Sequence, residues 1–180
     1  MNKILIFCLF IILISCENYS KLTLINNLPK TLEEVSGIEK YNNTALLWML
    51  NDGGNKPFIY KVDKKGDIVN KVAVNAKNND WEDITSDKEG KLYIADFGNN
   101  NNKRKKLRIL KIKYQDLLVK NLVEVTTIKF GYSAQKKFPP KKKNRFFDAE
   151  GLVYKNGFLY IFTKSRVKGN YGVTSFSYTC

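Results

Sequence analysis

The chain has 180 residues, of which 43% are hydrophobic and 13% aromatic. This composition suits one folded domain with an apolar core and argues against a disordered chain. The formal net charge is +14, from 31 lysines and arginines against 17 acidic residues, and there is no histidine. The lack of histidine excludes Ser-His-Asp triads, Cys-His pairs and HExxH zinc sites, so catalysis would have to use carboxylates, lysine, tyrosine or serine.

Lysine supplies nearly all of the positive charge, since the chain has only four arginines. Proteins that read base edges favour arginine for its bidentate fork, so we expect no nucleic-acid partner. Two dense basic runs occupy residues 103–106 and 136–145. We interpret them as solvated loops. Contact with anionic lipid or polysaccharide is the alternative, because such runs are attracted to anionic surfaces.

The N-terminus has the layout of a secretory signal. Lys3 precedes an apolar run from Ile4 to Ile14, and Ser15 precedes Cys16. The run is shorter than the roughly 20 residues that span a bilayer. The last four residues, Leu-Ile-Ser-Cys, resemble the lipobox of bacterial lipoproteins, and an ordinary signal peptide with an incidental cysteine is the alternative. The resemblance implies that residues 1–15 are removed, that Cys16 is lipidated, and that the protein is anchored to a membrane of the bacterial cell envelope.

After the signal we expect a lipidated linker at 16–27, a folded domain at 28–166 and an irregular tail at 167–180. The domain shows short apolar segments between turn signals such as Asn156-Gly157, a pattern that predicts strands. One helical turn is expected near Gln115–Leu118. The fold class is all-β. The expected strands are Leu46–Leu50, Phe58–Val62, Val69–Val74, Leu92–Ala95, Leu107–Ile112, Val123–Phe130 and Phe158–Thr163.

Three stretches of the domain repeat one pattern. Each has an acidic residue, an aliphatic residue soon after it, a turn, an aliphatic-aromatic strand and a polar exit. The repeats begin at Glu34, Glu82 and Glu150. A hairpin unit recurring at roughly 40–50 residues is typical of a β-propeller. The pattern therefore predicts a partial β-propeller with about three blades of four-stranded antiparallel sheet, and a β-sandwich with similar hairpins is the alternative.

In a propeller, equivalent positions of successive blades converge near the central axis. The repeat therefore predicts an acidic cluster there, and convergent carboxylates need protons, lysines or a hard cation. Ca²⁺ suits such oxygen ligands best. Alternatively, the acids cap strand edges through backbone amides. The predicted metal ligands are Glu34, Asp52, Glu82 and Glu150, with Asp83, Asp96 and Asp148 as supporting acids.

Several sequence segments of the three repeats resemble envelope β-propeller proteins of Bacteroidetes-type bacteria. Those proteins are broadly related to SdiA-regulated, phytase-like and NHL-type propellers. The resemblance covers roughly Leu28–Lys164, and its most specific phrases are Asp80–Ile84 and Asp96–Asn100. It implies a fold of about six blades, so we expect this chain to be a C-terminally truncated form. More distant relatives of this kind include Ca²⁺-dependent lactonases and esterases, which hold Ca²⁺ with Glu, Asn and Asp.

The leading functional hypothesis is a lipid-anchored binding or scaffold protein of the cell envelope, attached to the membrane through Cys16. One rival is a Ca²⁺-dependent hydrolase of esters, lactones or phosphoesters with an acidic site in the central channel. Another is a surface adhesin whose lysine-rich loops contact anionic glycan. Fold-level resemblance is weak support for any of these activities.

Overall fold

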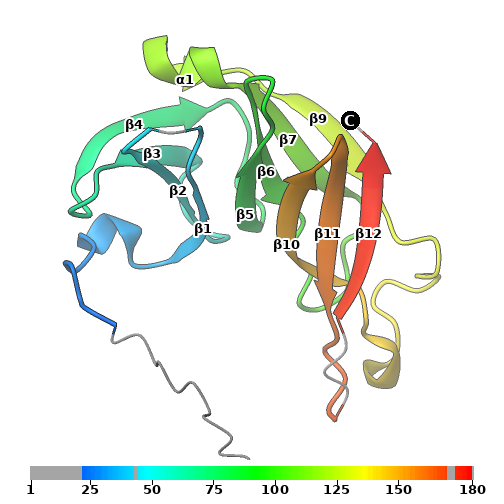
Figure 1. The fold of residues 1–180 in the computed structure, drawn as a ribbon. Coiled ribbons are helices and arrows are strands. Elements are labelled where there is room, and N and C mark those ends of the chain that lie inside the picture. The colour runs from blue at the N-terminus through cyan, green and yellow to red at the C-terminus, as the bar shows by residue number, and fades with distance from the viewer. Residues whose placement is uncertain (1–21, 43, 170–172, 180) are drawn as a thin grey trace, which may run out of the picture.

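The computed structural model describes residues 22–42, 44–169 and 173–179, the last of these segments by its backbone alone. The predicted signal peptide and Cys16 lie outside these residues. The described part is an all-β fold of three sheets, which Figure 1 shows fanned side by side. In the part of the chain that the structure describes, no helix is long and apolar enough to cross a bilayer.

Each sheet is built from strands that follow one another along the chain, with one exception. The first sheet contains β1 (Val35–Glu39), β2 (Leu47–Asn51), β3 (Phe58–Val62), β4 (Ile68–Val74) and β8 (Leu122–Val123). The second contains β5 (Trp81–Ser86), β6 (Lys91–Asp96), β7 (Leu107–Lys113) and β9 (Thr126–Phe130). The third contains β10 (Asp148–Lys155), β11 (Phe158–Lys164) and β12 (Val173–Thr179).

The exception is β8. It follows β7 of the second sheet along the chain but belongs to the first sheet. After β7 the chain forms the helix α1 (Tyr114–Val119) and then pairs β8 with β4 in parallel, through the Ala73 N–H bond to the Asn121 carbonyl (2.9 Å). It returns to add β9 to the edge of the second sheet. This excursion ties the two sheets together and covers the outer edge of β4, which would otherwise present unpaired backbone groups.

The first strands of the three sheets lie together on the inner side of the fan. β5 lies between β1 and β10, and the Leu152 N–H of β10 donates to the Asp83 carboxylate of β5 (2.7 Å). On the other side, Gly37 of β1 lies so near β5 that a Cβ there would be 2.8 Å from the backbone nitrogen of Ile84. Sheets arranged with their first strands side by side are the blades of a propeller.

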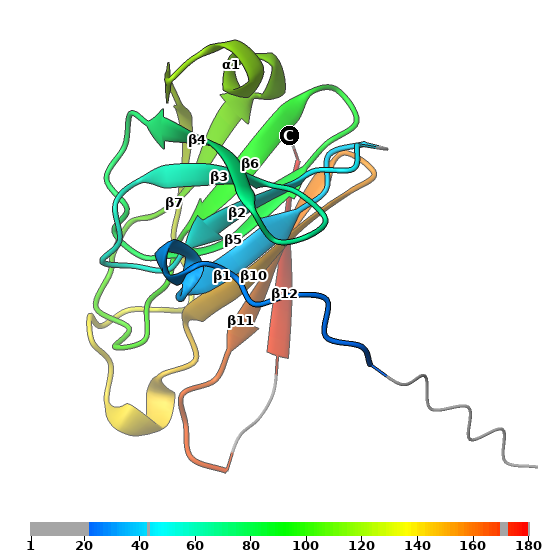
Figure 2. The same cartoon turned by 90° about the vertical axis from the view of Figure 1, so that its left-hand side faces the viewer.

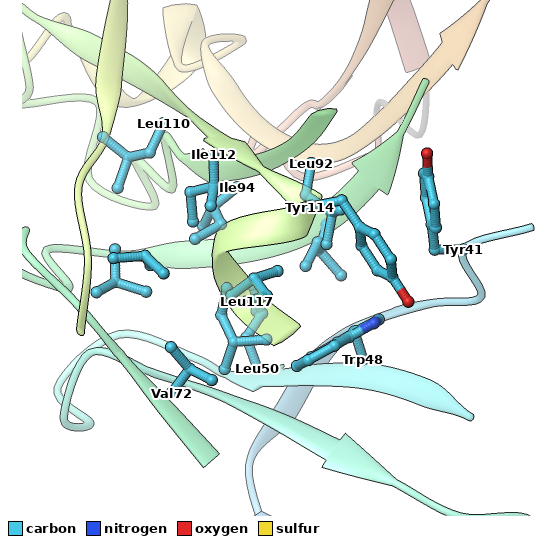
Figure 3. Packing of buried hydrophobic residues seen from close by; sticks show 14 of the residues in the cluster. Tyr41, Trp48, Leu50, Val72, Leu92, Ile94, Leu110, Ile112, Tyr114 and Leu117 are labelled. Carbon is cyan, nitrogen blue, oxygen red and sulfur yellow. The ribbon is translucent and has the colours of Figure 1, made fainter. Parts of the chain in front are cut away.

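Two apolar cores hold neighbouring sheets together. The core between the first and second sheets contains Trp48 and Trp81, both fully buried, and is closed by α1 through Leu117. Tyr114 stacks on Tyr41 with ring centroids 3.8 Å apart (Figure 3). A second core, which includes Tyr93 and Phe97, joins the second and third sheets. Each fully buried aliphatic side chain in such a core is worth about 1.5–3 kcal/mol.

The free face of the first sheet is partly covered by the residues that precede it. Figure 2 looks onto this sheet and shows the short 3-10 turn Lys30–Leu32 lying against it. Leu32 is buried there against Met49, Tyr60 and Val62.

The predicted strands are confirmed within a few residues, except that Val123–Phe130 is divided into β8 and β9. The prediction of an irregular tail is wrong for residues 173–179. These residues form β12, which pairs with all seven residues of β11 from Phe158 to Lys164. The free edge of β11 explains this, since its backbone groups need partners. The first strands β1, β5 and β10 were not among the predicted strands, although their acidic phrases marked the repeats.

Candidate functional site

The predicted acidic residues gather at one end of the fan. In each sheet the first two strands are antiparallel, so the start of the first strand lies beside the end of the second. This pairing brings the residues that open β5 and β10 close to the residues that follow β2 and β6. The acids of several separate segments therefore share one face of the molecule.

Each sheet has a bulge at the start of its first strand. The pairing with the second strand shifts by one residue there, and the three shifts occur at equivalent positions. A bulge leaves one residue without a partner and changes the direction of its side chain. The bulged residues are Ser36 in β1, Glu82 in β5 and Glu150 in β10.

This register corrects the predicted alignment of the repeats. The residue of the first sheet that is equivalent to Glu82 is Ser36, not Glu34. Glu34 lies two residues earlier and corresponds to Asp80. The sequence pattern did not resolve this difference of two residues, because either position places an acid before the following aliphatic residue. Glu34 is exposed, and its carboxylate accepts a hydrogen bond from Asn55 Nδ2 (2.6 Å).

The most compact acidic group consists of Asp52, Asp80 and Glu82. Each offers a carboxylate oxygen, and these three oxygens lie within 4.8 Å of one another. Asp52 follows β2, Asp80 precedes β5, and Glu82 is the bulged residue of β5. We call these three residues the carboxylate cluster. Its members come from two sheets and depend on the packing between them.

Two glycines allow the cluster to form. A Cβ on Gly98 would lie 2.5 Å from Asp80 Oδ2 and would overlap Glu82 Oε1. A Cβ on Gly53 would overlap Asp80 Oδ1. The carboxylate of Asp80 is thus packed between two backbone segments that follow β2 and β6, and any side chain at either glycine would displace it.

The carboxylates of the cluster disfavour one another's charge. Burial raises the pKa of Glu82 to about 8, and the nearby carboxylates of Asp52 and Glu150 add to the effect. Burial also raises the pKa of Asp80, with a further contribution from Asp52, while the Arg104 guanidinium opposes the rise. Without a cation, the cluster would therefore retain a proton near neutral pH.

No lysine or arginine within the described ranges forms an ion pair with a member of the cluster. By contrast, the buried Asp96 nearby is paired with Arg104 (2.9 Å) and with Arg108. The cluster thus has no ion pair of its own in this part of the chain, and Arg104 acts on it only at longer range, through its charge on Asp80.

The other predicted acids have structural partners. Asp83 accepts backbone hydrogen bonds within β5 and from β10, and its pKa is raised by burial. Asp148 accepts the Asn99 N–H (2.7 Å) and pairs with Arg166. These two residues and Asp96 join segments of the sheets to one another.

Glu150 shares features with both groups of acids: its pKa is raised like that of Glu82, and it has an ion-pair partner like Asp148. Burial and the adjacent Asp148 raise its pKa to about 7, and Arg166 and Lys164 oppose the rise. Its carboxylate pairs with Arg166 (2.5 Å). It affects the cluster through its charge on Glu82 rather than as one of the three grouped ligands.

The structure therefore brings together two of the four predicted ligands, Asp52 and Glu82, and adds Asp80, which the sequence argument did not single out. A signal for Asp80 was present, because it is an acid two residues before Glu82, in the segment that opens the second repeat. The arginines gave another signal. In this lysine-rich chain, three of its four arginines pair with acids at this end of the fan: Arg104, Arg108 and Arg166.

No protein-family model matches this chain, and no curated protein sequence matches it. Among solved structures, a luciferin-regenerating enzyme is similar over 72% of this chain and 37% of its own, with 18% identity and a TM-score of 0.43. Virginiamycin B lyase from Staphylococcus aureus is similar over 79% of this chain and 40% of its own (16% identity, TM-score 0.42). A streptogramin B lyase gives the same two coverages with 14% identity and a TM-score of 0.40.

The chain thus spans 37–40% of the length of these proteins. Because all three TM-scores are below 0.5, the assignment of a propeller-like fold rests on the three sheets described above.

Proposed function

We propose that this protein is a lipid-anchored binding module of the bacterial cell envelope, related to the Bacteroidetes-type propellers, whose carboxylate cluster holds Ca²⁺. The anchor is inferred from the signal and the Leu-Ile-Ser-Cys sequence that ends at Cys16. The cluster would supply a fixed dication at the end of the fan. A dication held by protein carboxylates can bind a carboxylate or phosphate group of a partner directly.

One observation carries the metal assignment: three carboxylate oxygens lie within 4.8 Å of one another, and no ion-paired cation accompanies them in the described residues. Three ionised carboxylates at that separation repel strongly in a partly buried site. Hard oxygen ligands in this number suit Ca²⁺, which completes its shell of six to eight oxygens with water and carbonyl groups. Gly53 and Gly98 leave room for the carboxylates to converge, since a Cβ at either position would overlap them, and this supports the site.

The test compares thermal unfolding of the full chain in detergent with and without Ca²⁺. A ligand at about 100 times its Kd adds about 2.7 kcal/mol of stability, which corresponds to a rise in Tm of roughly 5–10 °C for a domain of this size. Glu82→Gln should abolish the rise because it removes one ligand charge. Glu89→Gln is the matched control, since Glu89 is exposed in the turn at the other end of β5.

An equal Ca²⁺ response in the wild type and Glu82→Gln would overturn the site. A lost response in both variants would mean that the effect follows total charge rather than the cluster.

The raised pKa of Glu82 favours a second candidate function, hydrolysis. A carboxyl group that keeps its proton at neutral pH can act as a general acid toward an ester, lactone or phosphoester. A panel of such substrates, assayed with the wild type and Glu82→Gln, tests this candidate. Turnover that persists in the variant would contradict it.

A further inference from the structure

The lysine-rich loop between β9 and β10 forms an open pocket of about 530 Å³. Figure 1 shows this loop at the same end of the fan as the start of β10. Four lysines line the pocket together with two aromatic rings: Lys136, Lys137, Lys141, Lys143, Phe146 and Phe147. A pocket of this volume falls within the roughly 300–1,000 Å³ typical of ligand sites.

Buried polar side chains hold the loop in shape. Gln135 is buried, and its Nε2 donates to the carbonyl of Asn102 (2.8 Å) and to that of Lys137 (3.2 Å). Asn102 is fully buried, and its Oδ1 accepts the backbone N–H of Phe147 (3.0 Å). The two ends of the loop are therefore fastened to one interior asparagine. A loop held in this way loses little conformational entropy when a ligand binds.

The positive charge of the pocket is not neutralised by the protein. Residues 131–147 contain no aspartate or glutamate. Within the described ranges, none of the four lining lysines forms an ion pair. Like charges concentrated in one hollow raise the local potential and attract anions.

We propose that this pocket binds an anionic sugar of an acidic polysaccharide. The lysine ammonium groups suit the carboxylate, phosphate or sulfate of such a sugar, and Phe146, which is 38% exposed, offers an apolar surface for a ring face. The concave shape favours a single sugar unit over the flat surface of a bilayer. This site is separate from the carboxylate cluster and does not depend on Ca²⁺ there.

The test measures binding of fluorescent oligogalacturonate to the full chain in detergent, with a malto-oligosaccharide of equal length as the neutral comparison. We expect the acidic sugar alone to bind. Neutralising two lining lysines in Lys141→Gln/Lys143→Gln should weaken binding at least about tenfold, or about 1.4 kcal/mol. The control Lys88→Gln/Lys155→Gln removes the same charge from two exposed positions, in the turn after β5 and at the end of β10, at the other end of the fan and should bind like the wild type.

Three results would overturn the proposal. Equal losses in the two double variants would mean that net charge, not the pocket, governs binding. Binding of the neutral sugar with equal affinity would remove the role of the lysines. Lysine-dependent binding to bicelles containing phosphatidylglycerol, without binding to oligogalacturonate, would assign the pocket to a membrane surface instead.

Discussion

Replacing Glu82 with glutamine is expected to stabilise the Ca²⁺-free protein at alkaline pH. The folded-state pKa of about 8 exceeds the ordinary value of 4.5. Below the ordinary value the carboxyl group is protonated in both states. Between the two values the unfolded chain loses its proton while the folded chain keeps it, so the free energy of unfolding falls as pH rises and levels off above about 8. Glutamine has no such titration.

The size of the effect follows from the pKa difference. A difference of one is worth about 1.4 kcal/mol, so the rise from 4.5 to about 8 sets an upper bound of about 5 kcal/mol. Glu82 is only partly buried, and solvent screening lowers this to about 2 kcal/mol. We therefore expect Glu82→Gln to be about 2 kcal/mol more stable than the wild type near pH 8.5 and nearly equal to it near pH 5.

Urea unfolding in the presence of a chelator measures this difference. The two tryptophans, Trp48 and Trp81, are fully buried, so their fluorescence reports on loss of the core. Parallel stability curves for the wild type and Glu82→Gln across this pH range would refute the proposed environment of Glu82. With Ca²⁺ present, the wild type should recover the difference, because metal binding requires the ionised carboxylate.

Three further predictions concern other positions. Gly98→Ala should abolish the Ca²⁺ response, because its Cβ would overlap the ends of the Asp80 and Glu82 side chains and push their carboxylates apart; a rise in Tm with Ca²⁺ equal to that of the wild type would contradict this. Asp96→Asn should cost about 3 kcal/mol in urea unfolding, because it leaves two partly buried guanidinium groups without their common partner. Cys16→Ala should release the protein from the membrane fraction after cell lysis, because it removes the proposed lipid attachment; the variant remaining in the membrane pellet would argue against the anchor.

Much of the fold could be predicted because its signals are local. Strands such as Phe58–Val62 and Leu107–Lys113 are rich in apolar residues and bounded by turns, and a strand needs little else to be recognised. The Asn156-Gly157 turn was also readable, since both residues have a positive φ (52° and 85°), as the tight hairpin turn requires. The first strands escaped prediction because a bulge interrupts the alternation of each of them.

The candidate site was only partly predictable, because its geometry depends on register and on packing between sheets. The repeat indicated that acids would gather, but it misaligned Glu34 by two residues, and only the pairing with β2 corrected this. The sequence also did not reveal which acids form ion pairs with arginine. Asp96 and Glu82 look alike in sequence, yet two arginines pair with Asp96 and none with Glu82 in the described residues.

The amino-acid sequence was sufficient to predict an all-β chain of repeated hairpins with acids at the start of each repeat. Those properties follow from the alternation of apolar residues and from turn chemistry, which act over a few neighbouring residues. The grouping of Asp52, Asp80 and Glu82 could be seen only in the folded chain, because these residues meet through the contact of two sheets. Distances between segments far apart in sequence are set by the packing of the whole core, and no local pattern encodes them.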